Sequence, residues 1–407
     1  MFGARPDCDP DRPRLRQLEV QRRRERGQAG IVLVDPLGIT PNQCYVPEAL
    51  LPIVGRLDGT RTVPDIEREL RARGYELPDG FVARLVQQLD GALMLDTPAA
   101  RAAEEAAVRA FLRGSGGARP ARHAGSAGYP ADPDELRAHL AGLVPRAPRP
   151  SGPAPRGLVA PHIDLQRGAD GYRAAYSWLG AREPADLYVI FGTGHKGPAA
   201  PVTGLLLDWD TPLGRVRSDL EFIERVHAHL GPIDPRDAFL HRDEHSIEFQ
   251  VLMLAHLFGG RSFTVAGFLC GSLPSEDGDP GSEAWLQDLL AAFRTAAQES
   301  GKRVCWIAGA DLAHLGPWFG DPAPVDASLL SRLERDDRAR LAHLGIPAPG
   351  AFHREVVCAG NPDRICGTTP MYLCAALADA PAELLHYGQA VAEDGSQVVS
   401  FCSLGMG

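Results

Sequence analysis

The chain has 407 residues, of which 44% are hydrophobic and 23% are charged, a composition typical of folded globular proteins rather than disordered chains. Its 42 basic and 52 acidic side chains give a formal net charge of −10, which argues against a protein that coats nucleic acid or anionic lipid. At about 150 residues per domain, the length predicts two or three domains.

Eight cysteines are spread singly along the chain and form no CxxC pair, so the spacing typical of zinc ribbons, iron–sulfur proteins and thioredoxin-like sites is missing. No apolar run approaches the roughly 18 residues that a membrane span needs, and the N-terminal stretch is Arg-rich without a signal-peptide pattern. We therefore expect a cytoplasmic protein with reduced thiols and with no membrane or nucleic-acid partner.

The first quarter of the chain predicts a small accessory module. Residues 1–27 are predicted to be a disordered arm, and residues 28–97 combine a strand pattern at Ile31–Val34 with three short helical patterns. This combination predicts a winged-helix-like domain. The stretch Leu57–Ile66 resembles PqqD-like domains, which recognise peptides, although an accessory domain without a ligand is an equal alternative. Residues 98–119 are predicted to form a helical linker.

From residue 120 to residue 407, apolar strand patterns alternate with helical patterns. Such alternation predicts an α/β fold, with one sheet covered by helices on both faces. The predicted strands are Leu158–Ala160, Leu187–Phe191, Val202–Leu207, Phe263–Leu269, Val304–Ala308, Leu384–Tyr387 and Val398–Cys402. The predicted helices include Asp219–Leu230, His245–Leu257, Glu283–Gln298, Val325–His343 and Pro370–Ala378.

Three histidines come shortly after predicted strands. These are His162, His195 and His314, and Asp311 lies three residues before the last of them. In open α/β sheets the loops beyond the carboxyl ends of the strands meet at one crevice, so we expect these side chains to lie together. A single such histidine is more often structural, but three in equivalent places favour a functional site.

A cysteine and a polar cluster are further candidates. Cys366 precedes Thr369, a plausible helix N-cap, and Pro370, a good first helical residue, so the helix dipole favours its thiolate. The alternative is a small buried residue in a tight turn. His245 belongs to a dense polar cluster, residues 243–248, at the start of a predicted helix, where charged groups can also act simply as caps.

One motif suggests a different chemistry. His241, Glu244 and His245 fit the HxxEH pattern of inverted zinc peptidases, which needs both histidines on one helical face. Because the helix is predicted to begin near Asp243, His241 lies outside it. A zinc hydrolase using these three residues is therefore a minority hypothesis.

The C-terminal region resembles the Memo family, whose prokaryotic members are called AmmeMemoRadiSam system protein B. The matching pieces, in chain order, are His123–Ser126, Tyr129–Pro130, Ala160–His162, Gly192–His195, Thr211–Gly214, Asp243–Glu248, Asp311–His314 and Ile365–Gly367. Their order is far more specific than any single piece. The resemblance implies a fold similar to class III extradiol dioxygenases, which cleave catechol rings with ferrous iron held by two histidines and one carboxylate.

In Memo proteins a cysteine takes the place of that carboxylate. Carried over to this chain, the resemblance implies His162, His195 and Cys366 as metal ligands, with iron(II) or copper as the metal and zinc not excluded. It also implies a radical-SAM protein and an Ammecr-type protein as partners. Two departures from the family pattern, Lys196 and Asp164, change the polarity of the pocket and leave the substrate open.

Together these features predict a metal-dependent redox enzyme that uses oxygen on an aromatic or peptide-like small substrate. In this hypothesis His314 moves protons, Asp311 orients His314 or stabilises its charge, and His245 is an acid/base or substrate-orienting group. The main alternative is a binding or adaptor protein that kept the fold and lost the chemistry.

Overall fold

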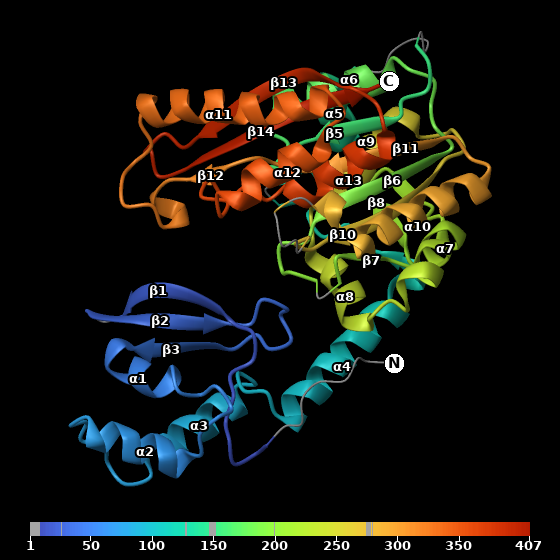
Figure 1. Ribbon diagram of the computed structural model, residues 1–407. Helices are drawn as coiled ribbons and strands as arrows, with labels where there is room; N and C mark the ends of the chain where they lie inside the picture. Colours follow the sequence, from blue (N-terminus) through green and yellow to red (C-terminus); the bar gives the residue numbers. More distant parts are fainter. Residues whose placement is uncertain are drawn as a thin grey trace. The chain divides into compact units, whose positions relative to one another are not determined.

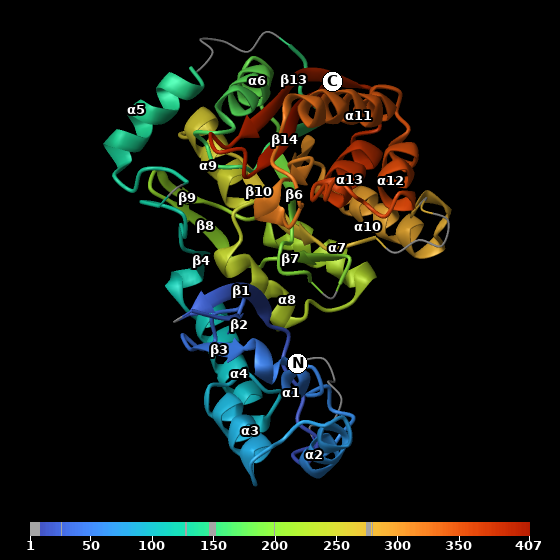
Figure 2. The same ribbon diagram turned by 90° about the vertical axis from the view of Figure 1, so that its left-hand side faces the viewer.

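The computed structural model describes residues 9–25, 27–126, 128–145, 152–198, 200–273, 278 and 280–407. The chain forms two compact units, Met1–Arg113 and Gly114–Gly407, and each is described by itself below (Figures 1 and 2).

The first unit is an antiparallel sheet followed by helices. Its strands are β1 (Glu19–Glu25), β2 (Gln28–Val34) and β3 (Gln43–Pro47), and its helices are η1 (Glu48–Leu50), α1 (Leu51–Val54), α2 (Val63–Ala72), α3 (Phe81–Gly91) and α4 (Pro98–Arg113). Helix α2 begins at Val63 because Thr62 and Asp65 form a reciprocal capping box. The inner face of α2 buries Ile66 and Leu70 in the hydrophobic core of this first unit.

The predicted disorder of residues 1–27 is wrong where the structure describes a strand, since β1 pairs with β2 over its full length. Residues 1–8 lie outside the described residues. Strand β1 has the sequence Glu-Val-Gln-Arg-Arg-Arg-Glu and is largely exposed, so it lacks the alternation of apolar and polar residues by which a strand is recognised. Its backbone pairing with β2 stabilises it. The winged-helix prediction and the domain boundaries at 28–97, 98–119 and 120–407 stay predictions.

The second unit is built on one mixed sheet, which confirms the α/β prediction. In the described part of the chain this sheet has eight strands, in the order β12-β14-β5-β11-β6-β10-β7, with β13 paired to β14. The central strands β5 (Gly157–Ala160), β11 (Val304–Gly309), β6 (Leu187–Thr193) and β10 (Thr264–Cys270) are parallel. The other strands are β7 (Val202–Gly204), β12 (His314–Leu315), β13 (Ala382–Val391) and β14 (Val398–Met406); a separate small sheet contains β4 (Ala118–Arg119), β8 (Asp208–Thr211) and β9 (Gly214–Val216).

Helices cover both faces of the large sheet. On one face, Val189 and Phe191 share a core with α7 (Leu220–Leu230), α10 (Ala284–Ser300) and α13 (Thr368–Ala378). The opposite face packs against α6 (Ala169–Gly180) and α9 (Glu248–Phe258). The remaining helices are α5 (Pro133–Leu143), α8 (Pro235–Leu240), α11 (Ala327–Gly345), α12 (Pro349–Cys358), η2 (Ser115–Gly117), η3 (His241–Asp243), η4 (Pro280–Ser282) and η5 (Pro317–Phe319). Among the described helices, none is both long and apolar enough to cross a membrane.

Two glycines let the start of α9 approach the sheet closely. A Cβ atom on Gly309 would lie 2.2 Å from the carbonyl oxygen of Ser246, and one on Gly192 would lie 2.5 Å from the side chains of Ser246 and Ile247. Any larger residue would push the segment before α9 away from the strands. The strand ends and this segment are therefore in direct contact, and the candidate site lies there.

A buried ion pair ties strand β4 to α9. Arg119 is fully buried and donates from Nη1 to Glu248 at 2.5 Å, while its Nε and Nη2 donate to the backbone carbonyls of His241 and Glu244 at 2.7 Å each. Glu248 also accepts hydrogen bonds from His123 and Tyr129. Burial raises the pKa of Glu248, but the charge of Arg119 and the hydrogen bond from His123 outweigh it and lower the pKa to about 2.

Replacing Arg119 is expected to destabilise the protein strongly, because Glu248 would remain as a buried charge without its cation. We expect Arg119→Met to lower the free energy of unfolding by about 3–5 kcal/mol. The control is Arg122→Met, since Arg122 is exposed and pairs with Asp243, and such a pair contributes about 0–1 kcal/mol. Urea denaturation of both variants checks this, and equal small losses would contradict it.

Candidate metal centre

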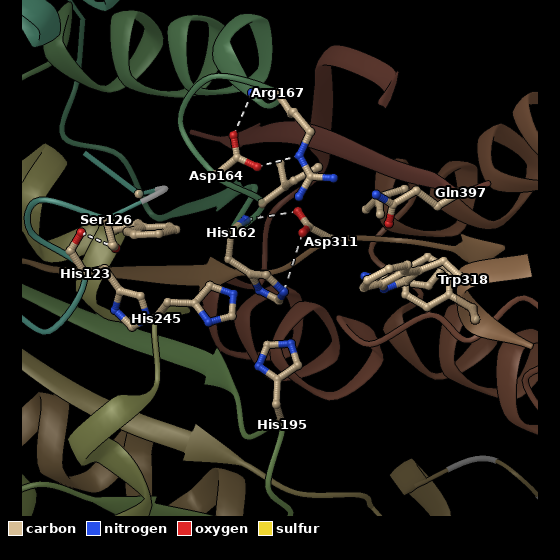
Figure 3. A pocket seen from close by; sticks show the side chains of 16 residues that line it. His123, Ser126, His162, Asp164, Arg167, His195, His245, Asp311, Trp318 and Gln397 are labelled. Carbon is tan, nitrogen blue, oxygen red and sulfur yellow. Dashed lines mark hydrogen bonds and ion pairs between the residues drawn. The ribbon is translucent and has the colours of Figure 1, made fainter. Parts of the chain in front are cut away.

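Three candidate side chains follow three neighbouring strands of the sheet. His162 lies two residues after β5, Asp311 two residues after β11 and His195 two residues after β6, and these strands are adjacent in the order β5-β11-β6. The loops that follow β5, β11 and β6 therefore meet at one edge of the sheet, as predicted. The side chains line one pocket of about 400 Å³ (Figure 3). Its lining also includes His123, Ser126, Gly128, Ile163, Asp164, Arg167, His245, Phe249, His314, Trp318, Phe319, Gln397 and Val399.

His162 is fixed by its neighbours in one orientation. Its backbone N–H donates to Asp311 at 2.9 Å, and its Nδ1 donates to the carbonyl oxygen of Gly309 at 2.9 Å, which leaves Nε2 for other contacts. That Nε2 atom lies 3.5 Å from Sγ of Cys366 and 3.5 Å from Oδ2 of Asp311. Burial alone lowers the pKa of His162, but the charges of Asp311 and Cys366 outweigh it and raise the pKa to about 9.

His195 is held by the buried carboxylate of Glu244. Its Nδ1 lies 3.0 Å from both carboxylate oxygens, and its backbone N–H donates to the same group at 3.1 Å. Glu244 also accepts from the backbone N–H groups of His245 and Ser246. Burial raises the pKa of Glu244, yet the hydrogen bond and charge of His195 hold it below its usual range. Glu244 therefore acts as the positioning group of His195, whose Nε2 is left for Cys366 and the pocket.

Cys366 lies on the turn that leads into α13. The helix begins at Thr368 with Gly367 as its N-cap, so the predicted cap at Thr369 and start at Pro370 are two residues late. Gly367 donates its N–H to the carbonyl oxygen of Asp311, which anchors the turn beside the histidines. Burial raises the pKa of the Cys366 thiol, but the charge and hydrogen bond of His162, with a hydrogen bond from His195, lower it to about 5.

The donor set of these residues fits a metal ion. The ligand atoms of His162, His195 and Cys366 all lie within 4.8 Å of one another. Two atoms that bind one metal at about 2.1 and 2.3 Å in tetrahedral geometry lie roughly 3.5 Å apart, and His162 Nε2 and Cys366 Sγ are separated by 3.5 Å. Two imidazoles and a thiolate suit iron, copper or zinc.

His195, Glu244 and His245 form a second group with the same spacing. Both oxygens of Glu244 already accept hydrogen bonds from N–H groups of His195, and one also accepts from His245 and Ser246. A metal would have to displace these bonds. We therefore regard this second group as the support of the first, in the way that carboxylates commonly orient metal-binding histidines.

The structure places His245 inside the pocket beside the candidate ligands. Its ring stacks on that of His195, with centroids 4.9 Å apart, and lies 5.3 Å from the ring of His162. His123 lies 5.6 Å from His245 and lines the same pocket, although the sequence reasoning gave it no role beyond its place in a motif. Its bond to Glu248 brings the motif pieces His123–Ser126 and Asp243–Glu248 into contact.

The predicted pairing of Asp311 with His314 is wrong. Within the described residues, the Asp311 carboxylate contacts His162. Nδ1 of His314 instead faces the carbonyl oxygens of Leu312 and Arg364, and its ring packs edge-on against Phe319. Asp311 therefore orients His162, and His314 lies on the apolar side of the pocket.

The structure also overturns the zinc-hydrolase hypothesis. His241 is fully buried, and its Nε2 donates to the carbonyl oxygen of Thr203 at 3.0 Å, while its ring packs against Trp209. His241 belongs to the short helix η3, and His245 lies in the segment between η3 and α9, since α9 begins at Glu248 and not at the predicted His245; no helical face therefore carries both histidines. Among the described residues, His241 is in neither group that could hold a metal.

Comparisons with known proteins identify the family. The model of the family described as Memo-like protein matches residues 119–405. A MEMO1 family protein of Aquifex aeolicus is 28% identical over 319 residues, which is 78% of this chain and 79% of that protein. A MEMO1 family protein of Methanococcoides burtonii is 38% identical over 162 residues, or 40% of this chain and 55% of that protein. The chain belongs to the Memo-like protein family, as its motifs predict.

Glu244→Gln is expected to weaken metal binding much more than folding, because the amide cannot accept all the hydrogen bonds that orient His195. Loss of such a supporting group lowers metal affinity by about 10–100-fold. The adjacent Asp243→Asn is the control, since Asp243 pairs with Lys196 and Arg122 near the surface. Cobalt(II) titration, followed by thiolate absorption, measures both affinities. Equal affinities for the two variants would show that Glu244 does not position His195.

Proposed function

We propose that the chain is a metal-dependent oxidoreductase that uses oxygen on a small aromatic or peptide-like substrate. The observation that carries this proposal is the grouped ligand atoms of His162, His195 and Cys366, of which the two histidines line a pocket of about 400 Å³. Iron(II) or copper, held by these three residues, would supply electron exchange with oxygen and substrate. Zinc accepts the same donors but supplies no redox chemistry.

The other pocket residues bind and orient a substrate. His245 has its Nδ1 3.3 Å from Glu244, which leaves Nε2 on the pocket side to give or take a proton. His314 uses Nδ1 on backbone carbonyls and is the second candidate proton carrier. Asp311 keeps His162 oriented. The aromatic rings of Phe249, Phe319 and Trp318 give the pocket walls on which an aromatic substrate packs.

An AmmeMemoRadiSam-type system supplies the proposed context. In it the chain would act beside a radical-SAM protein and an Ammecr-type protein, and the N-terminal unit would recognise a peptide in the manner of PqqD-like domains. The competing proposal is a binding or adaptor protein on the same fold. It is favoured by one observation, the 74% exposure of Trp318 at the pocket, since a large exposed aromatic residue is also typical of protein interfaces.

Metal analysis by mass spectrometry tests the proposal on full-length protein purified without oxygen. We expect near-stoichiometric iron or copper in the wild type and its loss in Cys366→Ser and His162→Ala. Cys374→Ser is the matched control: Cys374 is a buried cysteine of α13 whose Sγ contacts the carbonyl oxygens of Leu158 and Trp306, remote from the histidines. It is expected to keep its metal.

Two results would contradict the proposal. Metal that survives in Cys366→Ser would remove the thiolate from the site, and a metal-free wild type would favour the adaptor protein. If metal is present, oxygen consumption with aromatic substrates separates an enzyme from a metal-binding protein without turnover.

A further inference from the structure

The pocket has one end that the metal centre does not use. Figure 3 shows Arg167, Gln397 and Trp318 on one side of His162, and His123 and His245 on the other. The first side combines a cation and an amide with an aromatic ring, so it has its own recognition chemistry.

Asp164 holds Arg167 in a fixed orientation. One oxygen of Asp164 accepts the backbone N–H of Arg167 at 3.0 Å, and the other accepts its Nε. The two Nη groups have no partner among the described residues, and Figure 3 shows this end of the guanidinium on the side of Gln397. The side-chain amide of Gln397 likewise has no hydrogen bond within the described chain and lines the pocket.

Trp318 presents an exposed aromatic surface at the same end. Its side chain is largely exposed, but its backbone is anchored, because its N–H donates to the carbonyl oxygen of Ser396. The preceding Gly316 donates to Asp321, which pairs with Arg364. The exposed ring is thus held on a fixed loop, beside the apolar patch of Ile163, Val399 and Phe319. An indole ring on such a loop offers a flat apolar face against which an aromatic ligand can pack.

We propose that this end is a carboxylate subsite, so that the substrate is an aromatic molecule with a carboxylate group. The carboxylate binds the Nη groups of Arg167 and the amide of Gln397, and the ring lies against Trp318 and Phe319. Recognition of an amine by Asp164 is disfavoured, since both of its oxygens are already bonded to Arg167. The inference deepens the proposed function and rests on it for the reaction, but the subsite itself needs no metal.

Calorimetric titration of the metal-free, full-length protein tests the subsite with phenylacetate, phenylacetamide and phenethylamine. These probes share a ring and differ in the charge of the end group. We expect phenylacetate to bind at least about tenfold more tightly than the other two, as a charge-assisted bidentate hydrogen bond implies. Arg167→Met is expected to abolish this preference.

Arg173→Met is the matched control. Arg173 also pairs with an aspartate three residues earlier, Asp170, and its side chain is 49% exposed against 47% for Arg167, but it does not line the pocket. Trp318→Ala is expected to weaken all three probes several-fold and to leave the ratio of acid to amide unchanged. This separates the ring contact from the carboxylate contact.

Three results would overturn the carboxylate subsite: equal affinity for the three probes, tighter binding of phenethylamine, or no binding of any probe. A preference that survives in Arg167→Met would overturn it as well. Because every titration uses metal-free protein, absence of metal from the purified wild type would defeat the proposed oxidoreductase and leave the subsite intact.

Discussion

The arrangement of the candidate centre depends on the buried carboxylate of Glu244. It accepts hydrogen bonds from four N–H groups, two of them on His195 and the others on the backbone of His245 and Ser246. A buried carboxylate is costly unless such donors surround it, so the loop after β6 and the segment before α9 can close only in the geometry that supplies them. One group thereby fixes the position of His195, its tautomer and the place of His245.

Small residues in the strands make that closure possible. Gly192 and Gly309 lie under Ser246 and Ile247, where a Cβ atom would collide with the segment that carries Glu244. Alanine at either position would move Glu244 away from the strand ends, and His195 with it. The hydrogen bonds of Glu244 therefore depend on the close approach of α9 to the sheet. Two glycines allow this approach, in strands that otherwise carry mostly apolar side chains.

The sequence was informative where chemistry follows regular structure. Apolar strands followed by His162, His195 and Asp311 predicted the place where these residues meet, because parallel strands present their carboxyl ends at one edge. The partners behind them were not predictable. That Asp311 serves His162 and not His314, or that Glu244 serves His195, depends on contacts between segments far apart in the chain. Strand β1 was missed because a polar edge strand is held by backbone pairing, which leaves no side-chain pattern.

The turn of Cys366 is fixed to the Asp311 loop from behind the pocket. Arg340 bridges the carboxylates of Asp337 and Asp363. The hydroxyl of Ser400 donates to Asp337 and accepts the backbone N–H of Ala313. The backbone carbonyl of Asp363 accepts the N–H of His314. The histidines His162 and His195 are also anchored without their candidate ligand atoms, because their anchoring hydrogen bonds use the backbone N–H and Nδ1. The candidate ligand atoms, Nε2 of the two histidines and Sγ of Cys366, are thus not needed to hold the loops in place. A site built in this way can exchange a metal ligand or a substrate without losing its shape, because the interactions that maintain its geometry and those that perform its chemistry involve different atoms.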